Sequence, residues 1–294
     1  MYKILAAERL TPNSKLLQVE APQVTRRAQP GQFVMVRVDE KGERIPLTIA
    51  DLDRQGQTIT IIIQEVGKTS RKLANLEAGD SLATVVGPLG LPTEVERYGT
   101  VLCIGGGFGM AAMFPIARAY REAGNRIIGV IGARSENLLL WEKRLREISD
   151  ELYVTTDDGS RGRKGLVVEP LKDLLAEGRQ VDLVFSVGPL VMMRAVAEIT
   201  RPYGVRTVSS LNPIMVDGTG MCGACRVTVG GQTRFVCIDG PDFDAHEVDW
   251  AELRARQAMY LEDEKRAVEL YQCESCKSES QPGASGAGVS VVGG

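Results

Sequence analysis

The sequence predicts an antiparallel β-barrel, then an α/β domain built on a doubly wound parallel sheet, and then a small cysteine-rich loop domain with a C-terminal helix. Short β-branched runs fill the first third of the chain, strand-like and helix-like runs alternate in the middle, and a Gly- and Cys-rich loop follows near residue 220. The 294 residues are enough for more than one core. We expect domains at 1–97, 98–210, 211–247 and 248–294.

The composition excludes several classes of function. A net charge of -3 and a pI near 5.5 predict no surface for nucleic acid or an anionic membrane. No apolar run approaches the roughly 18 residues that a transmembrane helix needs. The first ten residues are charged and have no apolar core, so we expect no signal peptide. The six cysteines then indicate a reducing compartment and a cytoplasmic location.

The first domain has the pattern of a small barrel. Runs rich in Val, Ile and Thr recur every eight to fifteen residues or so, with turn residues between them. Six short strands with this spacing favour an antiparallel barrel. The strands are expected at 2–10, 14–21, 31–38, 45–51, 58–66 and 81–87.

Two stretches of this domain carry side chains that could bind a ligand. The run Arg44-Ile45-Pro46-Leu47-Thr48 places a permanent cation and a hydroxyl on a strand otherwise suited to packing. The run Gly67-Lys68-Thr69-Ser70 lies where an apolar strand ends and a helix is expected to begin near Ser70. Free N–H groups and hydroxyls at such a helix start suit a pyrophosphate. Both stretches also have structural interpretations, as a solvated arginine and as a helix N-cap.

From residue 98 to 210 the pattern changes to βαβ alternation, which is typical of a parallel, doubly wound sheet. Ligands of such sheets bind at the carboxyl ends of the strands. The strands are expected at 101–105, 127–133, 151–156, 183–188 and 205–210, and the helices at 110–122, 137–148, 166–175 and 190–201.

The strand ends of this domain predict a nucleotide site. The first strand runs into Gly105-Gly106-Gly107-Phe108-Gly109, an imperfect match to G-x-G-x-x-G because residue 110 is Met. The second ends in Gly132-Ala133-Arg134, where an arginine in place of an acid could read a 2′-phosphate. Asp157 and Gly188-Pro189 follow later strands. Cys103, inside the first strand, fits a buried core thiol.

The most specific motif runs from Asp217 to Cys237 and reads DGTGMCGACRVTVGGQTRFVC. Cys222 and Cys225 form a C-x2-C pair, and a predicted hairpin returns Cys237 twelve residues later. Plant-type [2Fe-2S] proteins use C-x4-C-x2-C and a distant fourth cysteine. Asp217, five residues before Cys222, would stand in the first ligand place. An oxygen ligand would make that iron more labile and move its potential.

Other interpretations of the loop stay open. A structural zinc site needs four closed ligands, and no second cysteine or histidine pair lies within the usual reach of Cys237. A disulfide conflicts with the reducing compartment. Asp239, Ser209 or Ser210 could replace Asp217 as the fourth ligand, because an Asp-Gly pair is ordinarily a turn.

In this order of parts, the sequence resembles the ferredoxin reductase-like electron-transfer subunits. This group includes the electron-transfer subunit of dihydroorotate dehydrogenase and the small subunit of the bifurcating NADH-dependent ferredoxin:NADP oxidoreductase, also called sulfide dehydrogenase. The motifs that match are R-x-P-[LI]-[ST], G-K-x-[ST], GGGxG, GAR and the cluster loop, over about residues 1 to 250. The run from Asn212 to Asp217, NPIMVD, looks like the bifurcating small subunit, whose first cluster ligand is Asp.

The resemblance implies FAD, a [2Fe-2S] cluster and NAD(H) as cofactors, although Arg134 by itself would favour NADP(H). The residues that it implies for the flavin and its ribityl or phosphate arm are Arg44, Pro46, Leu47, Thr48 and Ile62, and those for the FAD pyrophosphate are Gly67, Thr69 and Ser70. Those for the nicotinamide nucleotide are Gly105, Gly106, Gly107, Phe108, Gly109, Gly132, Ala133, Arg134, Asp157, Gly188 and Pro189. Those for the cluster are Asp217, Cys222, Cys225 and Cys237.

The mechanism implied has no acid–base pair and no nucleophile. Hydride would pass between NADH and FAD, and single electrons between the flavin and the cluster. Because no second substrate site is evident, a larger flavin/iron-sulfur oxidoreductase subunit is the expected partner. That partner could also be the rest of a dihydroorotate dehydrogenase, hydrogenase or sulfite reductase complex, and a scaffold that has lost its cofactors is a further alternative. His246 fits a surface or packing residue.

The C-terminal part predicts one amphipathic helix over 248–271, followed by a Gly/Ser/Ala-rich end. Cys273 and Cys276 form a second C-x2-C pair within it. The pair could complete a site with another chain or be two free thiols, and the sequence favours neither.

Overall fold

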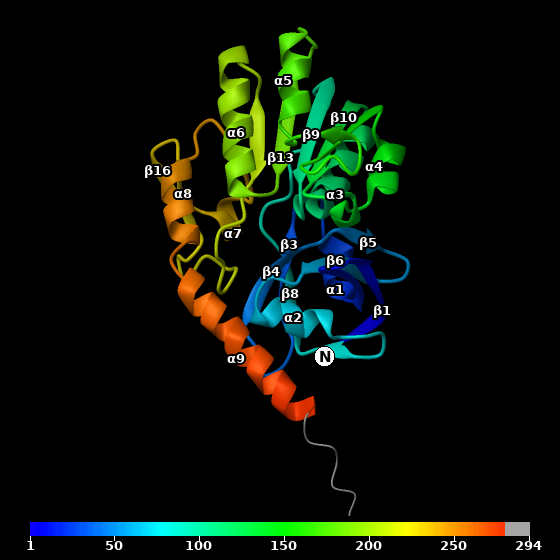
Figure 1. Ribbon diagram of the computed structural model, residues 1–294, viewed down its shortest axis with the longest axis vertical. Helices are drawn as coiled ribbons and strands as arrows, with labels where there is room; N and C mark the ends of the chain where they lie inside the picture. The colour runs from blue at the N-terminus through cyan, green and yellow to red at the C-terminus, as the bar shows by residue number, and fades with distance from the viewer. Residues whose placement is uncertain (280–294) are drawn as a thin grey trace, which may run out of the picture.

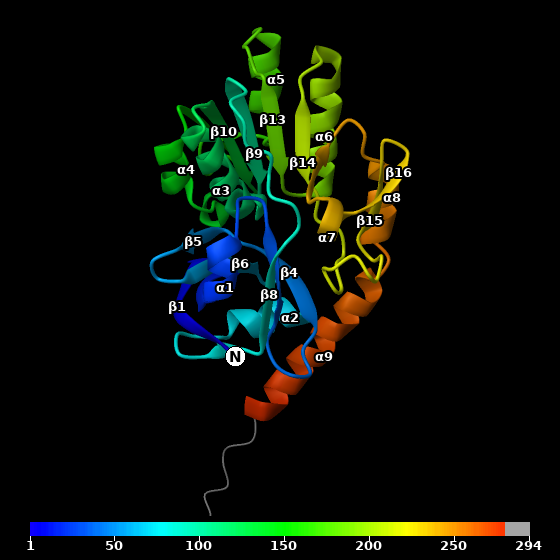
Figure 2. The same ribbon diagram turned by 180° about the vertical axis from the view of Figure 1, so that it is seen from behind.

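The computed structural model describes residues 1–279, with side chains to residue 272. A parallel sheet flanked by helices forms one end of the molecule, and the antiparallel strands of the N-terminal domain form the other (Figure 1). The cysteine-rich segment and the C-terminal helices run along one side of both ends (Figures 1 and 2). The fold class predicted from the sequence is therefore confirmed.

The N-terminal strands form two antiparallel sheets, ordered β5-β6-β2-β1-β7 and β4-β3-β8. Between them lies a core of buried aliphatic side chains that includes Ile4, Leu17, Val34 and Ile61. The elements are β1 (Tyr2–Thr11), β2 (Ser14–Glu20), α1 (Pro22–Arg27), β3 (Phe33–Arg37), β4 (Arg44–Thr48), β5 (Asp51–Asp53), β6 (Thr58–Gln64), α2 (Lys68–Ala74), β7 (Ser81–Leu82) and β8 (Thr84–Leu89).

Two of the predicted strands are interrupted because they change sheet. In the predicted strand 45–51, the Ile49 N–H donates to the Gln32 carbonyl and the Ala50 N–H to the Thr60 carbonyl, so β4 and β5 belong to different sheets. Ala83 separates β7 from β8 in the same way. These corners join the two sheets into a barrel. The short helix α1, which starts at Pro22, was not predicted.

The central sheet has the order β12-β11-β10-β9-β13-β14-β17, with every pair parallel except β14 and β17. This is the strand order of a doubly wound fold. The elements are β9 (Thr100–Gly106), α3 (Gly109–Glu122), β10 (Arg126–Ala133), η1 (Glu136–Leu138), α4 (Glu142–Ile148), β11 (Glu151–Thr156), β12 (Arg163–Lys164), α5 (Glu169–Ala176), β13 (Leu183–Val187), α6 (Leu190–Thr200), η2 (Arg201–Tyr203), β14 (Thr207–Ser210) and β17 (Asp242–Asp244).

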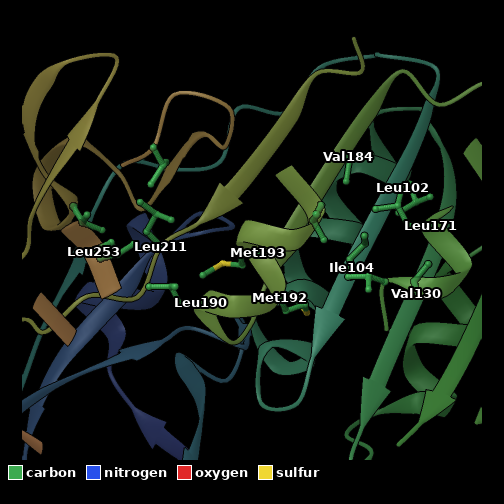
Figure 3. Close-up of a cluster of buried hydrophobic side chains, with 14 of the residues drawn as sticks. Leu102, Ile104, Val130, Leu171, Val184, Leu190, Met192, Met193, Leu211 and Leu253 are labelled. Carbon is green, nitrogen blue, oxygen red and sulfur yellow. The ribbon is translucent and has the colours of Figure 1, made fainter. Parts of the chain in front are cut away.

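The alternation of side chains along β9 separates two hydrophobic cores. Leu102 and Ile104 face α5 and α6, and Figure 3 shows them among the side chains of that cluster. Val101 and Cys103 face α3 and α4 on the other side of the sheet. Cys103 is the buried thiol that was expected, and burial raises its pKa to about 12.

Two predicted helices begin later than expected. The segment predicted as 137–148 starts with the 3-10 turn η1 and becomes α-helical only at Glu142, after Trp141 in a left-handed conformation (φ 54°). The segment predicted as 166–175 becomes helical at Glu169, with Pro170 in its first turn.

The prediction of one C-terminal helix over 248–271 is wrong, because the chain forms two helices there. The first packs against α6 and the cysteine-rich hairpin, whereas the second packs against α2 of the barrel, and these two surfaces require a break at residues 258–260. The segment comprises β15 (Arg226–Val229), β16 (Gln232–Phe235), α7 (Val236–Asp239), α8 (Trp250–Gln257) and α9 (Leu261–Glu279). The side chains of Cys273 and Cys276 lie outside the described residues.

None of the helices within the described residues combines the length and the apolar character that crossing a bilayer requires.

Candidate functional site

The two chemically notable stretches of the barrel lie next to each other. The Thr69 hydroxyl, on the first turn of α2, donates to the Glu43 carboxylate directly before β4, over 2.8 Å. In β4 the Arg44 side chain is exposed, and Pro46, Leu47 and Thr48 are half-buried. The predicted flavin strand and the predicted pyrophosphate turn therefore border one region of the barrel surface.

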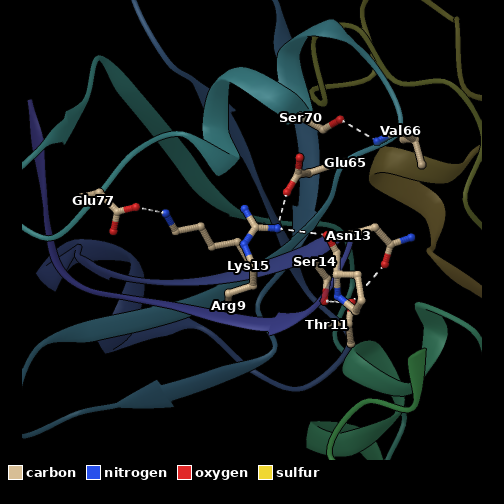
Figure 4. A network of polar contacts seen from close by, with 10 residues as sticks. Arg9, Thr11, Asn13, Ser14, Lys15, Glu65, Val66, Ser70 and Glu77 are labelled. Atoms are coloured by element: carbon tan, nitrogen blue, oxygen red, sulfur yellow. Dashed lines mark hydrogen bonds and ion pairs between the residues drawn. The ribbon is translucent and has the colours of Figure 1, made fainter. Parts of the chain in front are cut away.

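Ser70 has the structural role considered for it above, in which it caps the start of a helix. Its hydroxyl oxygen accepts the N–H group of Val66 at 3.0 Å (Figure 4) and that of Gly67 at 2.9 Å, which caps α2. The space beside Gly67 is open, because a Cβ placed there would meet no heavy atom within 4 Å. A ligand can therefore approach this turn closely. Ile62, in contrast, is buried with Ala50 and Met110 between the barrel and α3.

The predicted nucleotide residues converge at the carboxyl edge of the parallel sheet. Gly106 pairs with Gly132, Gly105 with Val187, and Ala133 with Thr156. The Gly107 N–H donates to the Gly132 carbonyl at 2.7 Å, and the Asp157 N–H to the Ala133 carbonyl at 3.1 Å. Arg134 and Asp157 are both exposed at this edge.

Close backbone approaches explain why this edge is rich in glycine. A Cβ at Gly109 would lie 2.1 Å from the Val187 carbonyl oxygen, and one at Gly188 would lie 2.7 Å from the Gly106 carbonyl oxygen. At Gly107, where φ is +53°, the space is open. The turn therefore presents bare backbone outward while it packs tightly inward, as a pyrophosphate cradle requires.

The four predicted cluster ligands form two pairs. The Cys222 N–H donates to Asp217 Oδ2 at 2.8 Å, and the Cys237 N–H to Cys225 Sγ at 3.4 Å. The β15–β16 hairpin returns Cys237 to Cys225, as predicted. Cys225 and Cys237 are each 2% exposed, whereas Cys222 is at the surface. One pair is therefore internal and the other faces outward.

The two pairs differ in their electrostatics. The N–H groups of Thr219 and Cys222 hold the pKa of the Asp217 carboxyl below its usual range. Burial, together with the neighbouring Cys225 thiol, raises the pKa of Cys237 to about 12. A metal must therefore displace a proton from Cys237 in the internal pair but meets a carboxylate that is already ionised at the outer pair.

This donor set fits a two-iron cluster. In the part of the chain that the structure describes, no three His, Cys, Asp or Glu side chains are placed together to hold one metal ion. Two pairs of ligands are what two irons need. Two of the alternative ligands have other partners: Ser209 is hydrogen-bonded to Ser186, and Asp239 accepts the Phe235 N–H.

The cluster loop lies against the barrel next to the predicted flavin strand. A Cβ at Gly218 would lie 2.7 Å from Met35 Cγ and 3.0 Å from Leu89 Cδ1. Met35, on β3, is paired with Pro46 on β4. One residue therefore separates the loop of Asp217 from the strand of Arg44 and Thr48. The sequence reasoning missed Met35, because nothing in its local pattern distinguishes it from other core residues.

His246 has a packing role. Its Nε2 lies 2.9 Å from the Thr200 hydroxyl, and its carbonyl oxygen accepts a hydrogen bond from Arg201. These contacts fasten the segment after β17 to the end of α6.

The comparisons with known proteins agree with this geometry. The family described as the iron-sulfur cluster binding domain of dihydroorotate dehydrogenase B matches residues 212–249. The chain is 49% identical over 261 residues to a Thermotoga maritima protein named dihydroorotate dehydrogenase B (NAD(+)), electron transfer subunit homolog, covering 89% of this chain and 92% of that protein. The chain belongs to the family of dihydroorotate dehydrogenase B electron transfer subunits and their homologues.

Two solved structures are also similar to this chain. A chain from a structure of the NADH-dependent reduced ferredoxin-NADP oxidoreductase, described for flavin-based electron bifurcation, is 47% identical, with a TM-score of 0.87 and coverage of 92% of this chain and 98% of that one. A Neisseria gonorrhoeae ferredoxin NADP+ reductase with bound FAD and NADP shares the fold at 18% identity and a TM-score of 0.59, over 69% of this chain and 90% of that one. The resemblance predicted from the motifs is confirmed.

We predict that Gly109→Ala lowers the free energy of unfolding by about 3 kcal/mol, because its methyl group would collide with backbone that cannot rotate away. Thermal denaturation of the purified chain measures this. Gly178→Ala is the control, since its methyl group would meet no heavy atom within 4 Å and its only cost, about 1 kcal/mol, is the positive φ. Equal losses in the two variants would contradict the close approach at Gly109.

Proposed function

We propose that this chain is an electron-transfer subunit that passes electrons between NAD(H), FAD and a [2Fe-2S] cluster, and from there to or from a larger partner subunit. The observation that supports this most is the contact between the Gly218 turn and Met35, because it sets the cluster loop one residue from the flavin strand. The 47% identity to a chain of the bifurcating oxidoreductase structure favours that kind of assembly.

FAD would bind the barrel along β4 and the turn before α2. Arg44 would offer its exposed guanidinium to the phosphates, while Pro46, Leu47 and Thr48 would line the ring and its arm. The backbone at Gly67, with Thr69 and Ser70 behind it, would hold the pyrophosphate. Ile62 is buried and would support this face of the barrel through packing.

The nicotinamide nucleotide would lie across the carboxyl edge of the parallel sheet. Gly105 to Gly109 and Gly188-Pro189 would hold its pyrophosphate and nicotinamide end, and Gly132 to Arg134 with Asp157 the adenosine end. We infer NAD(H) in preference to NADP(H), because Asp157 follows the strand adjacent to that of Arg134, and a carboxylate at this edge would repel a 2′-phosphate and accept a ribose hydroxyl.

The cluster would use the two pairs of ligands, with Asp217 and Cys222 on the outer iron and Cys225 and Cys237 on the inner one. Bound FAD and cluster together convert a two-electron hydride into single electrons. The chain supplies one buried cysteine pair and a second pair that combines the half-buried Asp217 with the exposed Cys222. Exposed Val216, Met221 and Ile238 surround the outer pair, which is the composition of a protein interface. We place the partner there and the assembly in the cytoplasm.

We predict that Cys222→Ser leaves the reduction of FAD by NADH within about two-fold of wild type but abolishes electron transfer to the partner subunit, because it removes only an outer ligand. Stopped-flow absorbance follows the flavin, and reduction of an acceptor by the reconstituted complex follows the second step. Thr219→Ala is the control, since only its backbone contacts Asp217. Equal loss of both steps in Cys222→Ser would refute this order of carriers.

We predict that Asp217→Cys still binds two irons and two sulfides per chain, but with a changed electron paramagnetic resonance spectrum and a shifted midpoint potential. The reason is that a soft thiolate would replace a hard oxygen ligand on one iron only. Iron and sulfide analysis with a redox titration measures this. An unchanged spectrum would show that Asp217 is not a ligand.

The dihydroorotate dehydrogenase B electron-transfer subunit is the second candidate, favoured by the family match at residues 212–249. The two functions differ in the partner that the chain requires. Purification of the native complex, followed by assays of NADH-dependent reduction of ferredoxin and NADP and of dihydroorotate oxidation, distinguishes them. Metal analysis with and without the partner would show whether Cys273 and Cys276 complete a site.

A further inference from the structure

Asp51 lies where the barrel meets the parallel-sheet domain. It is the first residue of β5, three residues after Thr48. Its carboxylate accepts a hydrogen bond from Arg118 on α3 at 2.9 Å and another from Arg144 on α4. Burial by itself would raise the pKa of this carboxyl, but the two guanidinium groups hold it below its usual range. The side chain is therefore a half-buried anion between two cations of the other domain.

The arginines are themselves fixed by aromatic rings. The guanidinium carbon of Arg144 lies 4.2 Å from the ring centroid of Phe114 and 4.3 Å from that of Trp141. The two rings meet edge to face at 5.2 Å, and Arg118 lies over Phe114 as well. Trp141 has a positive φ, which a tryptophan adopts only when its surroundings hold it there. The cations are thus pre-positioned for the carboxylate.

Two other acids make a matched comparison. Glu142 pairs with Arg146 and Arg161, and Glu151 pairs with Arg126 and Arg179. Their side chains are 18% and 25% exposed, and that of Asp51 is 19% exposed. All three acids therefore have two arginine partners and similar burial. Asp51 takes both of its arginine partners from the other domain, whereas Glu142 and Glu151 take theirs from their own domain. Among the described residues, Glu94 and Arg206 also pair across these two domains, but both of their side chains are exposed.

The ion pair also links the two halves of the proposed site. On the barrel side, Asp51 follows the strand of Thr48 through a corner of only two residues. On the other side, Arg118 belongs to the helix that begins at Gly109, at the glycine-rich turn. A displacement of Asp51 against Arg118 therefore moves the flavin strand relative to the nucleotide turn.

We propose that Asp51 is a positioning residue, whose ion pairs with Arg118 and Arg144 set the nicotinamide of NADH against the flavin at the distance that hydride transfer requires. This rests on the proposed function. Asp51 is not among the residues proposed to hold FAD or the nucleotide, so its loss should change the geometry of transfer and not the binding of either cofactor. A misplacement of about 1 Å can slow a transfer step by about 100-fold.

The test compares the isosteric variants Asp51→Asn, Glu142→Gln and Glu151→Gln in the complete chain with its cofactors bound. We expect normal FAD content in all three and a lowered flavin reduction rate at saturating NADH, by about 10- to 100-fold, only in Asp51→Asn. Its KM for NADH should stay near that of wild type.

The isotope effect with NADH deuterated at the transferred position should increase in Asp51→Asn, because hydride transfer becomes the slow step. Hydrogen exchange at β5 and α4 should also increase, and this readout needs no turnover.

A double variant separates coupling from simple destabilisation. If the ion pair is the cause, Asp51→Asn with Arg144→Gln should be no slower than the slower single variant. Arg144→Lys, which keeps the charge but not the stacking, should give an intermediate rate and serves in place of Asp51→Asn if that variant does not fold.

The outcomes are distinct. Wild-type chain that holds FAD but is not reduced by NADH overturns the proposed function and this inference together. If NADH reduces the wild-type chain and the flavin of Asp51→Asn is reduced as fast as that of Glu142→Gln, the inference alone is overturned. A raised KM with an unchanged limiting rate overturns it too, since Asp51 would then act on nucleotide binding.

Discussion

The arrangement of this molecule depends on glycines whose backbone lies closer to neighbouring atoms than a Cβ would allow. Gly109 lies against the Val187 carbonyl, Gly188 against that of Gly106, and Gly218 against Met35. The first two contacts draw the strand ends of the parallel sheet into one edge. The third presses the cluster loop onto the barrel. Each of these positions lacks room for a Cβ, so glycines bring the three proposed cofactor sites near one another.

The two ligand pairs of the cluster loop differ in burial. Cys225 and Cys237 are buried beside the hydrophobic core that also contains Phe33 and Met35, whereas Cys222 is exposed among apolar side chains. Burial raises the pKa of Cys237 in the internal pair, whereas backbone N–H groups hold the pKa of the Asp217 carboxyl in the outer pair below its usual range. A cluster held in this way would be enclosed on the side of the buried cysteines and open on the side of Cys222.

The interactions that join the barrel to the parallel-sheet domain differ from those that hold the cluster loop against the barrel. Apolar packing of Ala50 and Ile62 against Met110 and Phe114 supplies the area, but apolar contacts are non-directional. The Asp51 carboxylate between two stacked arginines supplies direction, because hydrogen bonds to a guanidinium fork fix both distance and angle. Area and direction together define one relative placement of the two domains.

The sequence by itself predicted the fold class, the five long parallel strands of the sheet domain with the helices between them, and a candidate ligand set for the loop. These features depend on periodicity and on spacing within about twenty residues. It also placed Gly105 to Gly109 and Gly188-Pro189 at strand ends, where a parallel sheet must bring them together.

Only the tertiary structure decided which side chains meet across domains. The interruption of strands 45–51 and 81–87 depends on which sheet each half joins, and the break at 258–260 depends on two separate docking surfaces. Met35 and Asp51 belong to ordinary strand patterns, and their importance comes from Gly218, Arg118 and Arg144, which are distant in the chain. Local patterns report secondary structure, but contacts between residues far apart depend on the packing of the complete chain.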